Sequence, residues 1–436
     1  MSLPRYPKYK DSGVEWLGEI PTHWEVLPLF GVAVERNEPN RGMIENNLLS
    51  LSYGRIVQKD IDSNNGLLPE SFETYQIVHP GDIVFRLTDL QNDKRSLRTA
   101  IVEELGIITS AYLAAIPLRI HPQFFHYILR AYDLTKVFYS MGGGLRQSMN
   151  FWDVKRLPIL VPSPEEQLGI GTFLDAETGK IDALIKQIRR LIELLQEKRQ
   201  SVISHAVTKG LNPSASMKYS GIEWMGKIPA HWVVKRLKYC GDALIGLTYD
   251  PSDVVDEGEG ILVLRSSNVQ NGRIVFDDNV YVNQEVPERL IVRRGDILIC
   301  SRNGSRALIG KNAMIEEQAE GLTFGAFMTV FRSVQNPYLF WVLNSPLFEF
   351  QSSSFLTSTV NQLTVGNLRG FEIPLPPPDE RVAITAFLEF ACQRIDKLIS
   401  SVVRATELLQ ERRTAIISAA VTGKIDVRGL ESTEAA

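Results

Sequence analysis

A tryptophan-containing segment occurs twice in this chain, and this repetition limits the possible folds more than any other feature. The stretch "SGVEWLGEIPTHW" runs from Ser12 to Trp24, and "SGIEWMGKIPAHW" runs from Ser220 to Trp232. A shift of 208 residues superposes them, and ten of the fifteen positions from Lys10 to Trp24 are then identical. The chain of 436 residues is therefore predicted to contain a duplicated module related by a pseudo-twofold axis.

A second register of 214 residues extends the duplication to the end of each module. It pairs "GDIVF" at Gly81 with "GDILI" at Gly295, "VPSPEEQ" at Val161 with "LPPPDER" at Leu375, "KIDALI" at Lys180 with "RIDKLI" at Arg394, and "ELLQEKR" at Glu193 with "ELLQERR" at Glu407. Between these matched edges the two copies agree in pattern but hardly in residue. A repeat of this length exceeds the roughly 20 to 50 residues of a solenoid unit, so we expect two complete modules.

Each copy ends in signals for one long helix. Ser163, Pro164 and Glu166 form a capping box with proline at the first helical position, and the second copy keeps the proline and the acidic first turn. Each helix is predicted to span roughly 40 residues, or about 60 Å, and to end near Gly210 or Gly423. Apolar residues recur along them every seven positions, at Leu174, Ile181, Ile188, Leu195 and Val202 and at Leu388, Ile395, Val402, Leu409 and Ile416.

Residues three positions further on, such as Leu184, Leu191 and Leu398, are assigned as companions that complete an a/d stripe. Such a stripe alone also fits a bundle helix, a homodimer zipper or a scaffold. Two equal stripes within one chain favour an intramolecular antiparallel pair that acts as a spacer.

The divergent middles combine short β-like runs with turn signals and a helical stretch, which is typical of a mixed α/β (α+β) domain. The predicted fold has two such globular domains, separated by two long antiparallel coiled-coil helices. The boundaries are residues 8–162 for the first domain, 163–210 for the first helix, 211–217 for a linker, 218–376 for the second domain, 377–423 for the second helix and 424–436 for a tail.

Composition narrows the class of protein. The longest apolar runs are shorter than the roughly 20 residues of a membrane span, and no apolar signal segment opens the chain, so we expect a cytoplasmic protein. Cys240, Cys300 and Cys392 are expected to be free and packed, and the six histidines form no metal-binding motif. The formal net charge of −4 restricts any contact with DNA to local patches.

Polar and basic side chains cluster where the predicted strands end, in patterns that suit DNA. Arginine and lysine bind guanine edges and phosphates, whereas asparagine and glutamine bind adenine. For any single one of these residues, a solvated loop position is a better explanation than a DNA contact. Polar loops at matched positions that differ in residue between the copies nevertheless favour two DNA-reading surfaces. The candidates are Arg86, Thr88, Gln91, Asn92, Lys94, Arg95, Arg98, Arg146 and Gln147 in the first copy, and Arg302, Asn303, Ser305, Arg306, Lys311, Thr359, Asn361 and Gln362 in the second.

In the duplicated order of these segments, the chain resembles the DNA-specificity subunit of a type I restriction-modification system, from about Pro7 to Asp426. The resemblance implies two target recognition domains, each reading one half of a bipartite asymmetric DNA site, with the helices fixing the gap. It also implies that this chain has no catalytic residue, metal or cofactor of its own. Two methyltransferase (modification) subunits would supply S-adenosylmethionine and modify adenine, and restriction/translocase subunits using ATP and Mg would join to cleave.

Two other classes stay open. Turnover by the isolated chain would favour a self-contained DNA-modifying or DNA-cleaving enzyme. DNA binding that survives substitution of Arg86 and Arg302 would favour a coiled-coil adaptor that binds only proteins. One departure from symmetry, Arg381 in place of Gln167, bears on whether partner contacts are equal. The aromatic residues of the repeated segment are predicted to be structural: His23, His231, Trp16, Trp24, Trp224 and Trp232.

Overall fold

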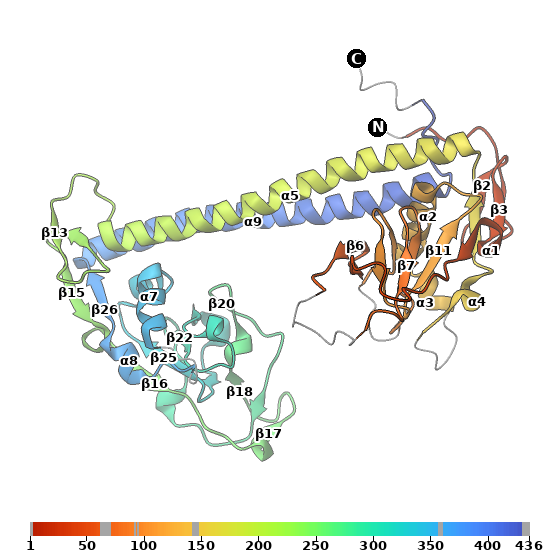
Figure 1. Ribbon diagram of the computed structural model, residues 1–436. Coiled ribbons are helices and arrows are strands. Elements are labelled where there is room, and N and C mark those ends of the chain that lie inside the picture. Colours follow the sequence, from red (N-terminus) through yellow and green to blue (C-terminus); the bar gives the residue numbers. More distant parts are fainter. Residues whose placement is uncertain are drawn as a thin grey trace. The chain divides into compact units, whose positions relative to one another are not determined.

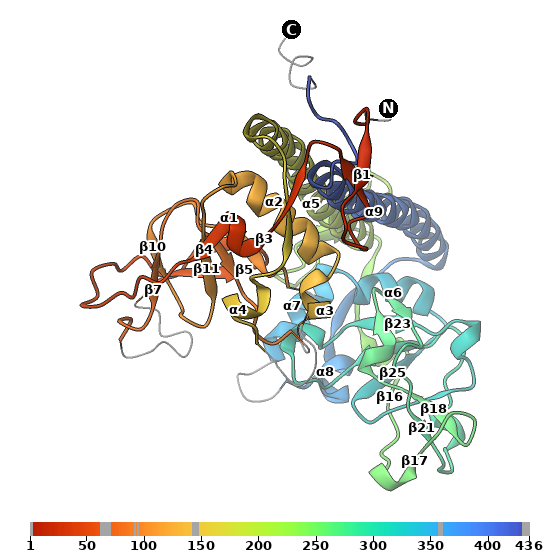
Figure 2. The same cartoon turned by 90° about the vertical axis from the view of Figure 1, so that its right-hand side faces the viewer.

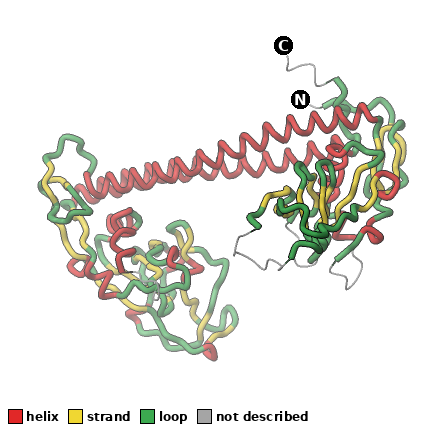
Figure 3. Tube along the Cα trace, in the orientation of Figure 1, coloured by secondary structure: helices red, strands yellow, loops and turns green. Residues whose placement is uncertain are grey.

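The computed structural model describes residues 3–61, 71–90, 93, 96–141, 148–355 and 361–429. The chain forms two compact units: unit 1 holds residues 1–188 and 403–436, and unit 2 holds residues 189–402. Both units therefore include part of each long helix, α5 (Pro164–Lys209) and α9 (Pro378–Val421), which are the longest red segments in Figure 3. The predicted mixed α/β class with two long helices is confirmed (Figure 1).

Unit 1 is built around a four-stranded antiparallel sheet, in the order β4-β11-β8-β9. Helix α2 (Pro122–Leu134) packs on one face of this sheet together with the long helices (Figure 2), and the strand pairs β5-β6 and β7-β10 belong to the other side. The strands and shorter helices of unit 1 are β1 (Tyr9–Asp11), β2 (Glu19–Pro21), β3 (Glu25–Pro28), α1 (Leu29–Val32), β4 (Ala33–Glu35), β5 (Leu49–Ser52), β6 (Arg55–Gln58), β7 (Gln76–Val78), β8 (Ile83–Phe85), β9 (Thr99–Ile101), β10 (Gly106–Ile108), β11 (Leu113–Pro117), α3 (Val137–Met141), α4 (Phe151–Val154) and β12 (Pro158–Val161).

Unit 2 repeats this sheet in the order β16-β25-β22-β23, with helix α6 (Asn336–Leu343) in the place of α2. A second sheet, β17-β21-β18-β24, lies over the core on the other face. The remaining bounds are β13 (Met217–Tyr219), β14 (Lys227–Pro229), β15 (Val233–Arg236), β16 (Asp242–Ile245), β17 (Val254–Val255), β18 (Ile261–Leu264), β19 (Val269–Gln270), β20 (Arg273–Ile274), β21 (Tyr281–Val282), β22 (Ile297–Cys300), β23 (Asn312–Met314), β24 (Thr323–Phe324), β25 (Met328–Arg332), α7 (Pro346–Phe355), α8 (Val365–Gly370) and β26 (Glu372–Leu375).

Alternation along the central strand of each sheet divides its side chains between two cores. Ile83 and Phe85 of β8 join the core with α2, whereas Val84 joins the core beneath β5 and β7. Strand β22 divides its side chains in the same way between the two cores of unit 2. Successive side chains of a strand point to opposite faces, so the short apolar runs after each "GD" pair are buried on both sides.

The aspartate of each "GD" pair fixes the turn before this central strand. Asp82 accepts a hydrogen bond from the backbone N–H of His79 at 2.9 Å, and Arg36 donates to both of its carboxylate oxygens at 2.9 Å. In unit 2 the equivalent Asp296 is bound by Arg332 at 2.7 Å, and each aspartate is only 2% exposed. A buried carboxylate needs such a partner. The aspartate–arginine ion pair therefore positions the central strand, and the candidate DNA-binding residues lie at the end of that strand.

The ends of the long helices follow the sequence signals closely. The capping box is formed, since Glu166 N–H donates to Ser163 Oγ and Ser163 N–H donates to the Glu166 carboxylate, both at 3.3 Å. Gly210 and Gly423 follow the last helical turns with φ of +75° and +70°, the left-handed conformation that glycine adopts most easily. No helix in the described ranges is long and apolar enough to cross a membrane.

The contact seam of the helices differs in phase from the predicted a/d stripe. Ile181 and Ile185 are buried, whereas the assigned companions Leu184, Leu191 and Leu398 are 44%, 44% and 54% exposed. The prediction of these companions was therefore wrong: the partner of each heptad residue lies four positions on. Several heptads carry an apolar residue at both positions, so sequence alone did not distinguish the two phases.

Matched ion pairs show that the helices pair in antiparallel fashion. In unit 1, Arg413 of α9 donates to Asp182 of α5 at 3.1 Å. In unit 2, Arg199 of α5 donates to Asp396 of α9 at 3.0 Å. These residues are equivalent at a shift of 214, so the same contact is made once in each unit with the roles of the helices exchanged.

The repeated tryptophan segment packs against the end of the other copy's helix. Trp24 is fully buried in a core with Ile417 and Val421 of α9, and a side chain added at Gly423 would collide with Pro21. In unit 2, Trp232 is fully buried near the end of α5, where a Cβ at Gly210 would lie 3.1 Å from its ring. Each module therefore needs its own copy of the segment, because each copy closes a different helix end.

Candidate nucleic-acid interface

In each copy, the loop after the central strand lies next to a second polar segment that is about 60 residues further along the chain. Thr88, in the loop after β8, forms an antiparallel bridge with Ser148, and Arg302, in the loop after β22, forms one with Gln362. Both residues of one bridge are related to those of the other by a shift of 214. Matching backbone bonds support the bridges: Met149 N–H to Leu87 O at 2.9 Å, and Leu363 N–H to Ser301 O at 2.7 Å. The loops thus share a backbone arrangement but present different side chains.

Short helices directly follow these bridges and are capped in an equivalent manner. Asn150 accepts hydrogen bonds from the backbone N–H groups of Trp152 and Asp153 at the start of α4. Thr364 accepts from the N–H of Asn367 at the start of α8. Asn150 therefore holds the bridged segment in place.

In unit 2 the bridged loop borders a groove of about 1000 Å³. Three predicted residues line it, namely Arg302, Asn303 and Asn361. Two further lining residues were not predicted from the sequence, Arg265 and Phe327. Arg265 follows the end of β18, so it could have been found among the polar residues at strand ends. Phe327 gave no signal, because it lies in an apolar run. The remaining lining residues are Leu247, Thr248, Tyr249, Ser266, Ser267, Asp278, Gly304, Gly325, Ala326 and Met328.

Several candidates of unit 2 are engaged in holding the loop. Asn303 donates to Ser266 Oγ at 3.0 Å, and Lys311 Nζ donates to the carbonyls of Ser266 and Val269 at 2.5 and 3.0 Å. Arg306 donates to the carbonyl of Ser353 at 3.3 Å, and Asn361 donates to the carbonyl of Gly304 at 3.2 Å. Ser305 is exposed at the tip of this loop.

In unit 1 the structure corrects the expectation that Arg98 contacts DNA. Its side chain is wholly buried, and its guanidinium donates to Thr88 O at 2.9 Å, to Tyr139 Oη at 3.0 Å and to the carbonyl of Asp93. Arg98 therefore shapes the loop from behind and cannot reach a ligand. In the sequence, an arginine next to a polar loop looks like a residue that contacts DNA, because the protein groups that it binds are not apparent there.

The other candidates of unit 1 are less fully placed. Arg86 and Thr88 are half-buried at the end of β8, beside the bridge to Ser148. Six further candidates of unit 1 lie outside the described residues: Gln91, Asn92, Lys94, Arg95, Arg146 and Gln147. Thr359 of unit 2 lies outside them as well.

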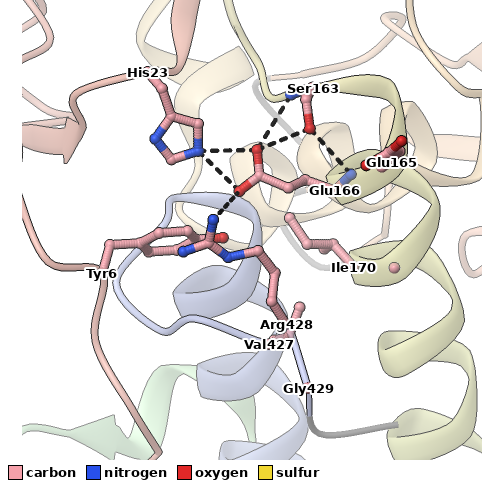
Figure 4. Close-up of a pocket in the computed structure, with 10 residues that line it drawn as sticks. Tyr6, His23, Ser163, Glu165, Glu166, Ile170, Val427, Arg428 and Gly429 are labelled. Carbon is pink, nitrogen blue, oxygen red and sulfur yellow. Dashed lines mark hydrogen bonds and ion pairs between the residues drawn. The ribbon is translucent and has the colours of Figure 1, made fainter.

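The histidine of the repeated segment binds the first turn of its own copy's helix. His23 Nε2 lies 2.9 Å from both carboxylate oxygens of Glu166, beside a pocket of about 340 Å³ that Tyr6 and Arg428 also line (Figure 4). Burial opposes the charge of Glu166, but bonds from His23 and Ser163 outweigh it, so the pKa of Glu166 lies below its ordinary value. In unit 2 the equivalent His231 lies 2.5 Å from Glu380.

These contacts give the histidines a structural role, as the sequence predicted. In unit 2 the indole N–H of Trp232 also donates to Glu380, at 2.9 Å. In the described part of the chain, no three histidine, cysteine, aspartate or glutamate side chains gather in a way that could hold a metal ion. The three cysteines are buried and free, and burial raises the pKa of each thiol.

Fold and site together define a class: a protein with two equivalent frameworks that present two different polar surfaces. Comparison with known proteins shows which proteins this chain is similar to. A scan of protein-family models finds no match. The putative type I restriction enzyme MjaX specificity subunit of Methanocaldococcus jannaschii is 26% identical over 433 residues, which cover 94% of this chain and 96% of that protein. The EcoKI specificity subunit of Escherichia coli K12 is 26% identical over 207 residues, covering 46% of this chain and 44% of its own length.

Solved structures agree on the fold. The HsdS subunit from Thermoanaerobacter tengcongensis aligns with a TM-score of 0.51 at 18% identity, covering 93% of this chain and 98% of its own. A chain from work on complex assembly and conformational transition of the type I R-M system aligns with a TM-score of 0.63 at 18% identity, covering 92% and 98%. The resemblance inferred from the sequence is confirmed: over 94% of its length the chain is similar to a protein that bears the name of a type I restriction enzyme specificity subunit, and its fold is that of the solved HsdS subunit.

Proposed function

We propose that this chain is the sequence-specific DNA-binding subunit of a type I restriction-modification complex, and that it reads a bipartite asymmetric site. Each unit would read one half of the site through its bridged loop. The observation that carries this proposal is the equivalent pair of bridges, Thr88 with Ser148 and Arg302 with Gln362, on one backbone arrangement. Conserving the framework while varying the side chains is what two readers of different half-sites require.

We further propose that two methyltransferase subunits bind this chain, one per unit. Each unit exposes a matched pair of leucines on its helices: Leu184 and Leu408 in unit 1, which are 44% and 55% exposed, and Leu398 and Leu194 in unit 2, which are 54% and 45% exposed. Leu184 is equivalent to Leu398, and Leu194 is equivalent to Leu408. Apolar side chains repeated at equivalent surface positions suit two copies of one partner.

In this proposal the chain contributes recognition and the partners contribute chemistry. S-adenosylmethionine would be bound by the methyltransferase subunits, and ATP and Mg by restriction/translocase subunits that join the complex. Phosphate contacts would supply affinity and loop contacts would supply sequence preference. The polar groups described at the helix starts are engaged in framework contacts, which supports a non-catalytic role.

Base-resolved methylation of plasmid DNA tests the proposal. Cells would carry the methyltransferase partner with this chain, or the partner alone. A new two-part motif that appears only with this chain is expected. Replacing residues 8–157 by the equivalent part of another specificity subunit should then change one half of that motif and leave the other half intact.

Two results would contradict the proposal. A stable complex that creates no new methylated motif would favour a protein-binding adaptor. Methylation or cleavage of DNA by this chain without any partner would favour a self-contained enzyme instead.

A further inference from the structure

We infer that Arg302, held against the ring of Phe327, reads a guanine in the half-site recognised by unit 2. This inference rests on the proposed function and adds the chemistry of one contact to it. It assigns Arg302 as the base-reading residue and Phe327 as the residue that positions it.

An exposed aromatic ring supports the side chain of Arg302. Its Cζ lies 5.2 Å from the centroid of Phe327, and Phe327 is 58% exposed at the groove. A phenylalanine that is left in solvent loses the stabilisation that burial would give it. The contact of the guanidinium with the ring recovers part of this loss and limits the directions in which the arginine can point.

The hydrogen-bonding groups of Arg302 stay available in this arrangement. A cation–π contact uses none of the hydrogen-bonding groups of the arginine, and the five N–H donors of a guanidinium lie in its plane. Arg265 in the same groove forms an ion pair with Asp278 at 2.9 Å, and Lys311 and Arg306 donate to backbone carbonyls. Arg302 makes no ion pair or side-chain hydrogen bond with any described residue, so its donors can serve a ligand.

The backbone beneath both residues is fixed. The carbonyl of Phe327 accepts hydrogen bonds from the N–H groups of Ser301 and Arg302, at 2.9 and 3.1 Å. The turn that precedes Phe327 is fixed as well, because Ala326 N–H donates to Leu247 O at 2.8 Å and any side chain at Gly246 would collide with the carbonyl of the turn. Less conformational freedom is therefore lost when Arg302 binds a ligand.

A fixed, planar set of donors suits a guanine edge. Arginine can donate two parallel bonds to the O6 and N7 atoms of guanine in the major groove, and such a pair discriminates against other bases. Besides the Arg265–Asp278 ion pair, the groove around Arg302 is lined by neutral amides and hydroxyls, including Asn303, Asn361 and Ser266. A phosphate contact would need the charge of Arg302 but not its planar fork, and this difference can be tested.

Unit 1 lacks the equivalent pair, so the inference concerns one half-site only. Thr88 occupies the position equivalent to Arg302. The equivalent of Phe327 follows from strand pairing. Ile83 and Ile297 are equivalent, and they pair with Ala115 and Phe331. Four residues before these partners lie Ala111 in unit 1 and Phe327 in unit 2, so Ala111 is the equivalent of Phe327.

The test is methylome sequencing of cells that carry the methyltransferase partner and full-length variants of this chain. Arg302→Ala and Arg302→Lys are both expected to relax one G·C position in the half-site of unit 2, with roughly ten- to hundredfold loss of discrimination there. Phe327→Leu should relax the same position less, because the stacking surface is lost but the fork remains. The half-site of unit 1 should not change.

Arg294→Ala is the matched control, since Arg294 is exposed in the turn before β22, at the opposite end of this strand from Arg302, and should leave the motif unaltered. Co-purification with the partner and an unchanged half-site of unit 1 show that a variant is folded. Absence of any two-part motif with the natural chain would refute the proposed function itself. A natural motif that persists unchanged in Arg302→Lys, or that has no G·C pair in the half-site of unit 2, would overturn this inference alone.

Discussion

In unit 1 the bridged loop after β8 is held from behind by the buried guanidinium of Arg98. In unit 2 the equivalent position carries the buried amide of Asn312. A second exchange accompanies the first, because Arg130 of unit 1 corresponds to Asn344 of unit 2. Asn344 donates to Asn312 Oδ1 at 2.7 Å, so the interior of unit 2 uses a neutral amide pair where unit 1 uses charges. Divergence between the copies therefore reaches beneath the surface that would read DNA.

The charged interior of unit 1 carries a cost that unit 2 avoids. Burial raises the pKa of Asp133, although the backbone N–H of Arg98 and the charge of Arg130 oppose this effect. Burial likewise lowers the pKa of Arg130 to about 10. Buried charges are tolerated when they are paired, but removing one partner leaves the other uncompensated. The two copies should therefore differ most in their response to substitution at these positions.

The largest predicted difference is between Arg98→Ala and Asn312→Ala. Loss of Arg98 should cost unit 1 about 3–5 kcal/mol, since the carbonyls of Thr88 and Asp93 and the hydroxyl of Tyr139 lose a buried, charged donor. Loss of Asn312 should cost unit 2 about 1–3 kcal/mol, since only neutral hydrogen bonds are broken. Hydrogen exchange measured by mass spectrometry reports each unit separately. Equal losses of protection in the two units would contradict the proposed difference between charged and neutral interiors.

Acid should destabilise unit 1 through His126, whose equivalent in unit 2 is Phe340. Burial, together with Arg130 and Arg413, lowers the pKa of His126 to about 3, and its buried Nδ1 has no hydrogen-bond partner among the described residues. The unfolded chain therefore binds a proton near pH 6.5, and the folded chain does so only near its own lower pKa. Stability is fully present above pH 6.5 and falls by about 1.4 kcal/mol per pH unit below it.

At pH 5 the loss attributable to His126 should reach about 2 kcal/mol. The variant His126→Phe takes the residue of the other copy and should abolish this loss. Denaturant unfolding of both proteins at pH 7.5 and pH 5 measures it, and the difference between them cancels the contributions of other titrating groups. An identical pH dependence in the variant would mean that His126 is protonated in the folded chain.

Much of the framework was predictable because its signals are local. A capping serine, a terminal glycine and a repeated tryptophan segment each act within a few residues of their own position, and each lies where it was expected. The phase of the helix seam was not predictable, since Leu184 and Ile185 are adjacent and both apolar. Arg98 and Phe327 were misread or missed for one reason: their environments are formed by residues far away in sequence, and polarity alone does not reveal burial.

Partner binding should be affected equally by substitutions in either unit. Leu184→Ala and Leu398→Ala each remove part of one exposed apolar pair, and each should weaken one of two partner sites roughly tenfold. Titration calorimetry with the methyltransferase partner should show one weakened and one unchanged site in each variant, and Lys186→Ala serves as an exposed control on α5. If either variant weakens both sites or neither, the leucine pairs are not the partner surface of one unit each.

The smallest predicted effect concerns the ion pairs between the helices. Asp182→Asn and Asp396→Asn should each cost less than about 1 kcal/mol, because these carboxylates are 35% and 45% exposed and water screens them. Asp182 should cost slightly more, since Arg55 also contacts it at 3.2 Å. Double-mutant cycles with Arg413→Ala and Arg199→Ala give the two coupling energies separately. Similar small couplings would show that the framework contacts have stayed duplicates while the interiors diverged, whereas a strong coupling in one unit only would extend the divergence to the helices.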